Sequence, residues 1–88
     1  ERKALEELAL KLTDIGSHAS AEDVQFEVYE VGKRHGYENL RDWFTALYEV
    51  LLGQSHGPRM GSFIALYGIE ETVGLIRRIL AGEEIGVV

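Results

Sequence analysis

The sequence predicts an all-α fold, a small bundle or cage of about five helices that forms a single domain. Apolar residues recur at intervals of three and four along most of the chain, which places them on one face of a helix. Glycines and N-cap residues separate these stretches. The chain has 88 residues, 45% of them hydrophobic, which is enough for one modest core and too few for a nucleotide-binding domain beside a second domain.

Two helices are expected in the first 36 residues. The first ends before Gly16, and its apolar face consists of Leu5, Leu8, Leu12 and Ile15. The second begins after Ser20, which has the capping-box spacing with Asp23. Residues 24–28 also alternate between apolar and polar, as in a strand. We favour a helix, because the valines share one helical stripe and Gly36 stands where a left-handed residue closes a helix. That stripe consists of Val24, Val28, Val31 and His35.

A central helix is expected between Asn39 and Gly53. Asn39 is an N-cap residue with Asp42 three positions later, and Gly53 is placed to end the helix. We expect Trp43 and Phe44 to lie in the core rather than to serve as base-stacking platforms. The apolar side covers an arc of about 160° at 100° per residue and consists of Leu40, Trp43, Phe44, Leu47, Tyr48, Val50 and Leu51.

Two more helices follow the turn-rich connection at residues 53–58. Pro58 suits the first position of a helix, which Gly68 then closes. A last helix begins at Ile69 and ends at Gly82. Gly74 inside it costs about 1 kcal/mol relative to alanine, so we expect close packing there. Residues 83–88 are expected to fray.

The composition excludes several classes of protein. Without cysteine the chain has no disulfide and no cysteine-based zinc site. Its apolar runs fall far short of the roughly 20 residues that cross a bilayer. A net charge of −6 is opposite to the usual footprint of a free-standing nucleic-acid binder, so RNA affinity should be weak. The chain opens with Glu1 and has no signal-peptide pattern, so we expect an excised piece of a cytoplasmic protein.

We expect no catalytic, cofactor or metal site in these residues. The run Gly53-Gln54-Ser55-His56-Gly57 matches the nucleophile elbow of α/β-hydrolases, but that motif needs a strand before the serine, where we expect a helix. No Lys-Ser/Thr pair follows the second glycine, so the run is not a P-loop. The three histidines, His18, His35 and His56, lack the i, i+4 spacing of metal ligands.

Arg59 marks a possible anion site. It lies in the run Gly57-Pro58-Arg59-Met60-Gly61, which opens a helix whose first N–H groups are unpaired and positively polarised. A phosphate oxygen would suit this position. The alternative is that Gly-Pro turns the chain and that Arg59 is simply solvated.

A second candidate surface lies on the second expected helix. Phe26, Tyr29 and Lys33 project opposite the valine stripe, and such a face can stack unpaired bases. The same face can equally pack against a neighbouring domain. Arg34 and Arg41 join Lys33 around the turn that follows this helix, which makes a local basic cluster.

Three runs of residues resemble the C-terminal region of class I lysyl-tRNA synthetases. They are Glu27-Val28-Tyr29-Glu30-Val31-Gly32-Lys33, then Leu40-Arg41-Asp42-Trp43-Phe44 with Leu47-Tyr48-Glu49-Val50-Leu51-Leu52-Gly53, and Gly57-Pro58-Arg59-Met60-Gly61-Ser62-Phe63-Ile64-Ala65-Leu66-Tyr67-Gly68. The resemblance covers roughly residues 20–80 and is most specific over residues 43–68. A looser version of the glycine pattern occurs in class I glutamyl-tRNA synthetases.

The resemblance implies a piece of a larger enzyme that attaches lysine to its tRNA. That enzyme would use ATP, bound in a catalytic domain whose HIGH- and KMSKS-type motifs are absent from these residues. Residues 1–82 would hold the anticodon end of the tRNA, and the partners would be lysine tRNA and the catalytic domain of the same chain, in a monomer. The implied phosphate, base or stacking contacts are Arg59, Lys33, Arg34, Arg41, His56, Tyr29 and Phe26.

The competing interpretation is a helical docking module that contacts other domains or a partner protein without touching RNA. A continuous basic groove joining Arg34, Arg41 and Arg59 would favour RNA. An exposed apolar patch would favour docking.

Overall fold

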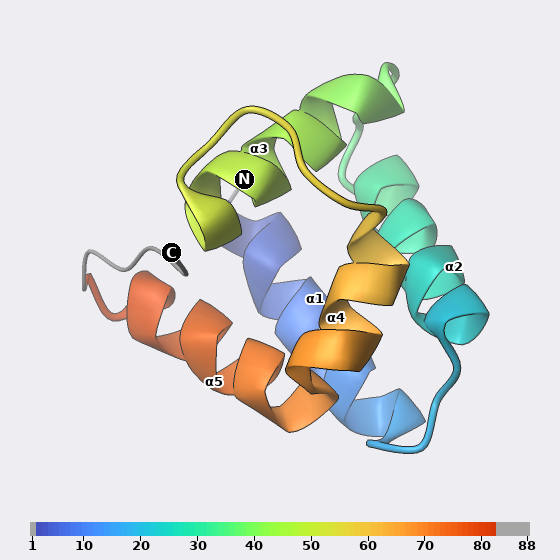
Figure 1. The fold of residues 1–88 in the computed structure, drawn as a ribbon. Helices are drawn as coiled ribbons and strands as arrows, with labels where there is room; N and C mark the ends of the chain where they lie inside the picture. The colour runs from blue at the N-terminus through green and yellow to red at the C-terminus, as the bar shows by residue number, and fades with distance from the viewer. Residues whose placement is uncertain (1, 83–88) are drawn as a thin grey trace.

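A computed structural model describes residues 2–82 and confirms the all-α prediction (Figure 1). Within this range there are five helices and no strand. The segment 83–88, which was expected to fray, lies outside the described residues. The helices are α1 (Arg2–Ile15), α2 (Ala21–Arg34), α3 (Leu40–Leu52), α4 (Met60–Tyr67) and α5 (Ile69–Leu80).

The sequence signals at the ends of α2 and α3 act as expected. The Asp23 N–H donates to Ser20 Oγ at 3.1 Å, and the Ser20 N–H donates to the Asp23 carboxylate at 3.4 Å, which completes the capping box. The helix interpretation of residues 24–28 is therefore confirmed over the strand pattern. Asn39 caps α3 by accepting the Arg41 N–H at 3.0 Å. Gly53 ends α3 in the left-handed region, with φ of 73°.

The start of α4 differs from the expectation for Pro58. The helix begins two residues later, at Met60, with Arg59 in the N-cap position. The carbonyl oxygen of Pro58 accepts a hydrogen bond from the Tyr48 hydroxyl at 2.7 Å, which ties the incoming loop to α3. This tertiary contact, together with burial of Met60, decides where the helix starts.

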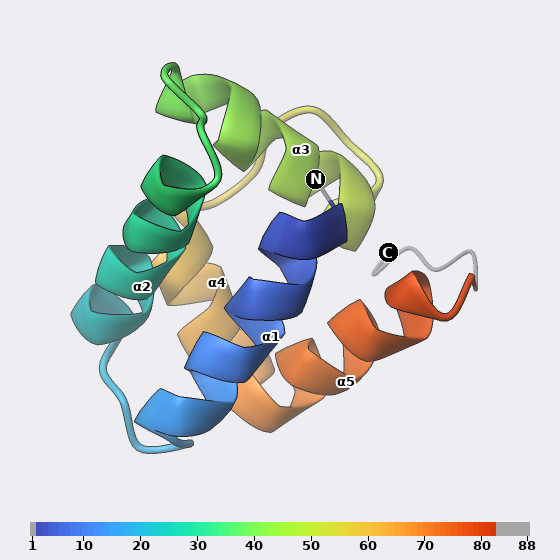
Figure 2. The ribbon, with the colours of Figure 1, turned by 180° about the vertical axis from the view of Figure 1, so that it is seen from behind.

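The helices form a cage in which α1 and α4 lie on opposite sides. Helix α4 faces the viewer in Figure 1, and α1 faces the viewer in Figure 2, which shows the molecule from behind. Helix α2 packs against both, and α5 packs against α1. Helix α3 crosses one end, and residues 53–59 lead from it back to α4.

Trp43 occupies the centre of the core, as expected. Its side chain is fully buried, and its indole N–H donates to the carbonyl oxygen of Val28 at 2.9 Å. A buried indole N–H without a partner would cost roughly 1–3 kcal/mol, so this bond allows a tryptophan to lie between α2 and α3. Phe44 is half-buried against the same core. The other large, fully buried side chains are Leu8, Leu12, Leu47, Leu51, Met60, Ile64, Ile76, Val24, Val28, Val31 and Thr72.

Close packing at a helical glycine occurs, but the prediction for Gly74 is wrong. Among residues 2–82, no atom beyond its chain neighbours and the backbone of its own helix lies within 4 Å of the position that a Cβ of residue 74 would take. Gly32 and Gly61 fill this role instead. A Cβ on Gly32 would overlap the Trp43 indole, and one on Gly61 would lie 2.5 Å from the carbonyl oxygen of Ala21. The two glycines thus bring α3 and α4 close to α2.

Candidate RNA-binding surface

Arg59 reaches from the N-terminus of α4 to the first turn of α2. Its Nη1 and Nη2 donate to the two carboxylate oxygens of Glu22 at 3.0 and 3.1 Å. These hydrogen bonds, and the attraction of the charges, lower the pKa of Glu22 and raise that of Arg59. The side chains keep 50% and 76% of their surfaces exposed. The pair is therefore within reach of a competing anion.

The backbone at the start of α4 is less available than the sequence suggests. The Gly61 N–H donates to the side-chain oxygen of Gln25 at 2.7 Å, so one of the first N–H groups is already paired. An anion here would depend mainly on the guanidinium of Arg59.

The outward face of α2 carries a line of exposed side chains. At 100° per residue, Glu22, Phe26, Tyr29 and Lys33 fall within an arc of about 60°. Phe26 is 60% exposed and Tyr29 is 44% exposed. Lys33 Nζ lies 3.3 Å from the Glu30 carboxylate, and its side chain is 59% exposed. We call the following set the α2 strip: Arg59, Phe26, Tyr29 and Lys33.

The α2 strip has a cation at each end and two rings between them. Arg59 is held at Glu22, and Lys33 lies eleven residues further along the helix, about 16 Å at 1.5 Å per residue. The rings of Tyr29 and Phe44 pack edge to face, with 5.7 Å between the ring centroids and 70° between the ring planes. Phe44 thereby supports the exposed Tyr29 from α3.

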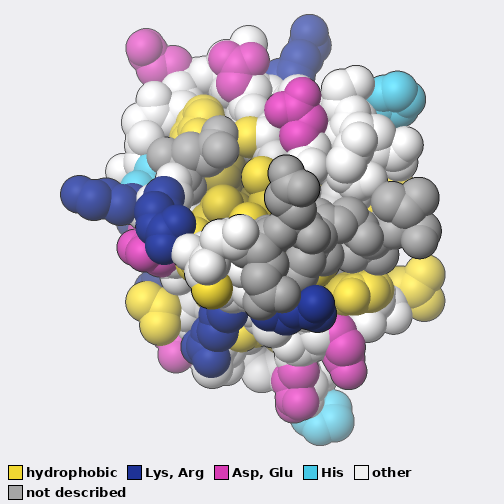
Figure 3. Space-filling model, turned by 90° about the vertical axis from the view of Figure 1, so that its left-hand side faces the viewer, with side chains coloured by type: hydrophobic (Ala, Val, Ile, Leu, Met, Phe, Trp, Pro, Cys, Tyr) yellow, Lys and Arg dark blue, Asp and Glu magenta, His cyan; other side chains and the backbone are white. Residues whose placement is uncertain are grey.

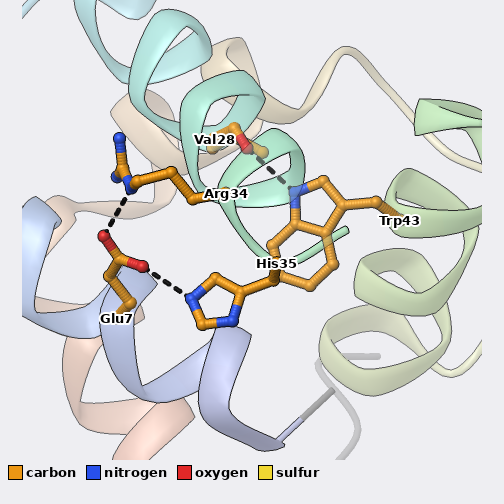
Figure 4. Close-up of polar contacts among 5 residues, drawn as sticks. All are labelled: Glu7, Val28, Arg34, His35 and Trp43. Atoms are coloured by element: carbon orange, nitrogen blue, oxygen red, sulfur yellow. Dashed lines mark hydrogen bonds and ion pairs between the residues drawn. The ribbon is translucent and has the colours of Figure 1, made fainter. Parts of the chain in front are cut away.

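Arg34 belongs to a different surface. Its side chain turns toward α1, where Nε donates to a Glu7 carboxylate oxygen at 2.7 Å (Figure 4). The other oxygen of Glu7 lies 2.6 Å from Nε2 of His35. The hydrogen bond with His35 is the largest cause that lowers the pKa of Glu7, and Arg34 lowers it further. Arg34 and Arg59 are thus near opposite ends of α2 and do not share one basic cluster.

Arg41 and His56 are exposed at the two ends of α3. Arg41 lies in its first turn and has no ion-pair partner among residues 2–82. His56 lies in the connection after α3, where its Nδ1 is 3.3 Å from the hydroxyl of Ser55. Both are exposed, so a ligand can reach them.

Cations also lie on the face opposite α2. Figure 3, which looks at the molecule from the α5 side, shows Lys and Arg side chains beside exposed hydrophobic ones. Basic residues near the ends of α1 and α5 include Arg2, Lys3, Arg77 and Arg78. Positive charge alone therefore does not locate an RNA site on this molecule. The aromatic rings distinguish the α2 strip.

Known proteins match this chain closely. The lysine–tRNA ligase of Roseobacter denitrificans is 55% identical over 83 residues, which cover 94% of the chain and 16% of that ligase. The chain corresponds to one segment of lysine–tRNA ligases. The ligase of Rickettsia akari is 55% identical over 65 residues, which are 74% of the chain and 12% of that ligase. The ligase of Rickettsia felis is 50% identical over 72 residues, which are 82% of the chain and 14% of that ligase.

The chain thus spans about an eighth to a sixth of the length of the curated relatives it matches. No family model matches the chain, and no solved structure does. Among residues 2–82, no helix has both the length and the apolar character that crossing a bilayer requires.

The hydrolase motif of this chain lacks its structural setting. Ser55 follows the end of α3, and residues 2–82 contain no strand on which a nucleophile elbow could be built. Ser55 and His56 are neighbours in an exposed connection.

Sequence reasoning missed Glu22 and Glu7, the acidic partners of two predicted contacts. Glu22 is 37 residues from Arg59 in the chain, and Glu7 is 27 residues from Arg34. No local pattern signals such distant pairs. Only the position of Glu22, one turn before Phe26 on the same face of α2, could have indicated that an acidic group borders the strip.

Proposed function

We propose that this segment binds the anticodon end of lysine tRNA as part of a class I lysine–tRNA ligase. The observation that carries the proposal is the α2 strip, in which two exposed rings stand between two exposed cations. The resemblance to class I synthetases and the match to lysine–tRNA ligases support it.

The chemistry of the strip suits an unpaired stretch of RNA. Proteins read single-stranded loops by stacking bases on aromatic side chains, at about 1–3 kcal/mol per base. Phe26 and Tyr29 offer two such rings, and Lys33 and Arg59 are placed to meet the flanking phosphates. The anticodon loop presents unpaired bases between phosphates, which is the complementary pattern.

The acidic partners limit the affinity. A phosphate that binds Arg59 or Lys33 competes with the carboxylate of Glu22 or Glu30. The net charge of −6 repels RNA as well. Binding by the segment alone is therefore weak and strongly dependent on salt, and the rest of the ligase supplies further phosphate contacts.

The remaining roles of the enzyme fall to residues outside this segment. Residues 2–82 contain no strand–loop–helix site for a nucleotide, so we assign ATP binding and lysine activation to the catalytic domain. The proposed setting is the cytoplasm, in a monomeric ligase. Arg34, Arg41 and His56 remain proposed RNA contacts outside the α2 strip.

The proposal is tested by titrating the 88-residue chain with an anticodon stem-loop of lysine tRNA at low salt. We expect NMR chemical-shift changes to concentrate at Phe26, Tyr29, Lys33 and Arg59. A stem-loop of the same length with a different loop sequence controls for charge alone. Changes that concentrate on α5 near Arg77, or no binding at all, would contradict the proposal.

A further inference from the structure

Helix α4 exposes an apolar surface that no other part of the described chain covers. Leu66 is 90% exposed, more than any other large hydrophobic side chain among residues 2–82. Tyr67 is 37% exposed, and its ring stacks on that of Phe63 with centroids 5.5 Å apart and planes 12° apart. We call Phe63, Leu66 and Tyr67 the α4 patch. Figure 1 shows that no helix lies over the outer side of α4.

The α4 patch differs chemically from the α2 strip. Helix α4 has no charged residue over its eight positions, unlike the other four helices. Acidic residues follow at once, since Glu70 and Glu71 lie in the first turn of α5. The cation nearest to the patch along the chain is Arg59, one turn before Phe63, and it is already paired with Glu22. With carboxylates at the other border, the patch repels a phosphate backbone. The patch therefore fits a protein surface with an apolar centre and a basic border, and not RNA.

Leu66 is not needed to hold the domain together. The inner side of α4 already buries Met60, Gly61 and Ile64 against α2 and the core. A leucine that is nine-tenths exposed contributes little to folding by area bookkeeping, because it removes almost no apolar surface from water. Isolated exposed leucines are common, but an exposed leucine beside two stacked rings forms a patch.

We infer that the α4 patch docks onto another domain of the same ligase polypeptide. The matched segment is only 12–16% of the relatives' length, so most of each of these ligases lies outside it. A tether raises the effective concentration of the docking partner to the millimolar range, so a small surface is enough. Contacts between domains of one chain bury about 600–1,500 Å², and the lower end of this range is below the roughly 1,200–2,000 Å² of stable interfaces between separate proteins.

The size of the patch disfavours a second copy of the chain. Helix α4 has eight residues and is about 12 Å long at 1.5 Å per residue. A stable interface between separate proteins usually needs about 800 Å² and 20–30 residues on each side. Three side chains on so short a helix fall well below this. The inference rests on the proposed place of the segment in a longer ligase, and not on its contact with RNA.

The test compares the 88-residue chain with a full-length chimaera in which this chain replaces the matched segment of the Roseobacter denitrificans ligase. Amide hydrogen exchange is measured in α4 of both proteins without RNA. We expect at least tenfold slower exchange in residues 63–67 of the chimaera. Leu66→Ser should remove this protection. The matched control, Leu10→Ser on α1, removes a leucine that is 59% exposed and should leave it intact.

Each other result overturns the inference. Equal exchange in the two proteins, or protection that survives Leu66→Ser, would exclude docking through this patch. Protection that appears only after the stem-loop is added would assign the patch to RNA. A dimer of the 88-residue chain in sedimentation equilibrium that Leu66→Ser dissolves would assign it to a second copy. If the chimaera fails to fold, the same exchange measurement is made on a second chimaera, in which this chain replaces the matched segment of the Rickettsia felis ligase. The stem-loop titration of the isolated chain tests RNA binding, and the exchange measurements test docking. Either proposal can therefore fail while the other stands.

Discussion

Gly32 lies directly beneath the indole of Trp43, so close that a Cβ on residue 32 would overlap the ring. The indole also donates its N–H to the carbonyl oxygen of Val28, one turn earlier in α2. These two contacts fix the distance and the rotation between α2 and α3. They also determine where Phe44, the residue after Trp43, meets Tyr29 of the α2 strip.

Gly32→Ala should therefore destabilise the fold although alanine favours helices. We expect a loss of about 1–3 kcal/mol in the free energy of unfolding, as for overpacking in a core. Gly74→Ala is the matched control, since residue 74 is also helical but has open space at the Cβ position, and it should stabilise by about 0.5–1 kcal/mol. Urea denaturation measures both. Equal effects of the two substitutions would contradict the packing described here.

Glu22→Gln should strengthen RNA binding. It removes the charge that pairs with Arg59, so a phosphate no longer competes with a carboxylate. Because the ion pair is exposed and screened by solvent, we expect a gain of only about two- to fivefold in affinity for the anticodon stem-loop. Fluorescence anisotropy at low salt measures it. Glu27→Gln, which removes the same charge elsewhere on α2, should have a smaller effect.

Arg59→Ala should weaken binding and reduce its salt dependence. For single-stranded nucleic acid, each phosphate contact contributes roughly 0.7 to the slope of log affinity against log salt, so the slope should fall by about that amount. Arg77→Ala on α5 changes the net charge equally but should leave the slope unchanged. A lower slope for Arg77→Ala would place the RNA on the α5 face.

Phe26→Ala should reduce affinity by roughly 1–3 kcal/mol if its ring stacks on a base. Leu10→Ala is a close control, because Leu10 and Phe26 are 59% and 60% exposed. Neither side chain is in the core, so both variants should unfold at nearly the wild-type temperature. An equal loss of binding in the two variants would argue against stacking.

Glu7 should make the stability depend on pH in the acid range. Its pKa in the folded chain lies below the ordinary value of 4.5, through the hydrogen bond with His35 and the contact with Arg34. Because Glu7 binds a proton more readily in the unfolded chain, its contacts with His35 and Arg34 favour the folded state. This stabilisation is fully present above about pH 5 and is lost as the pH falls through the pKa of Glu7 in the folded chain. The difference in unfolding free energy between wild type and Glu7→Gln, at most about 1 kcal/mol at pH 7, should therefore vanish in acid. A difference that grows below pH 4 would contradict this.

The sequence by itself determined the helices of this protein. The boundaries of α2 and α3 follow from local chemistry, such as the Ser20 and Asp23 box or the left-handed Gly53, and neighbouring residues are enough to specify such signals. The start of α4 is the exception, because tertiary contacts place it at Met60 rather than at Pro58. The exposure of Phe26 and Tyr29 also followed from the helical period, because the valine stripe fixed which side of α2 faces the core.

Only the tertiary structure decided which residues share a surface. The partners of Arg59 and Arg34 are 37 and 27 residues away, and the close packing belongs to Gly32 rather than to Gly74. These facts depend on how the helices are placed against one another, and periodicity within one helix contains no information about that placement. The predicted cluster of Lys33, Arg34 and Arg41 was therefore divided, since Arg34 turns toward Glu7 of α1 and Arg41 lies on α3. Phe26 and Tyr29 are both exposed on α2, as the helical period predicts.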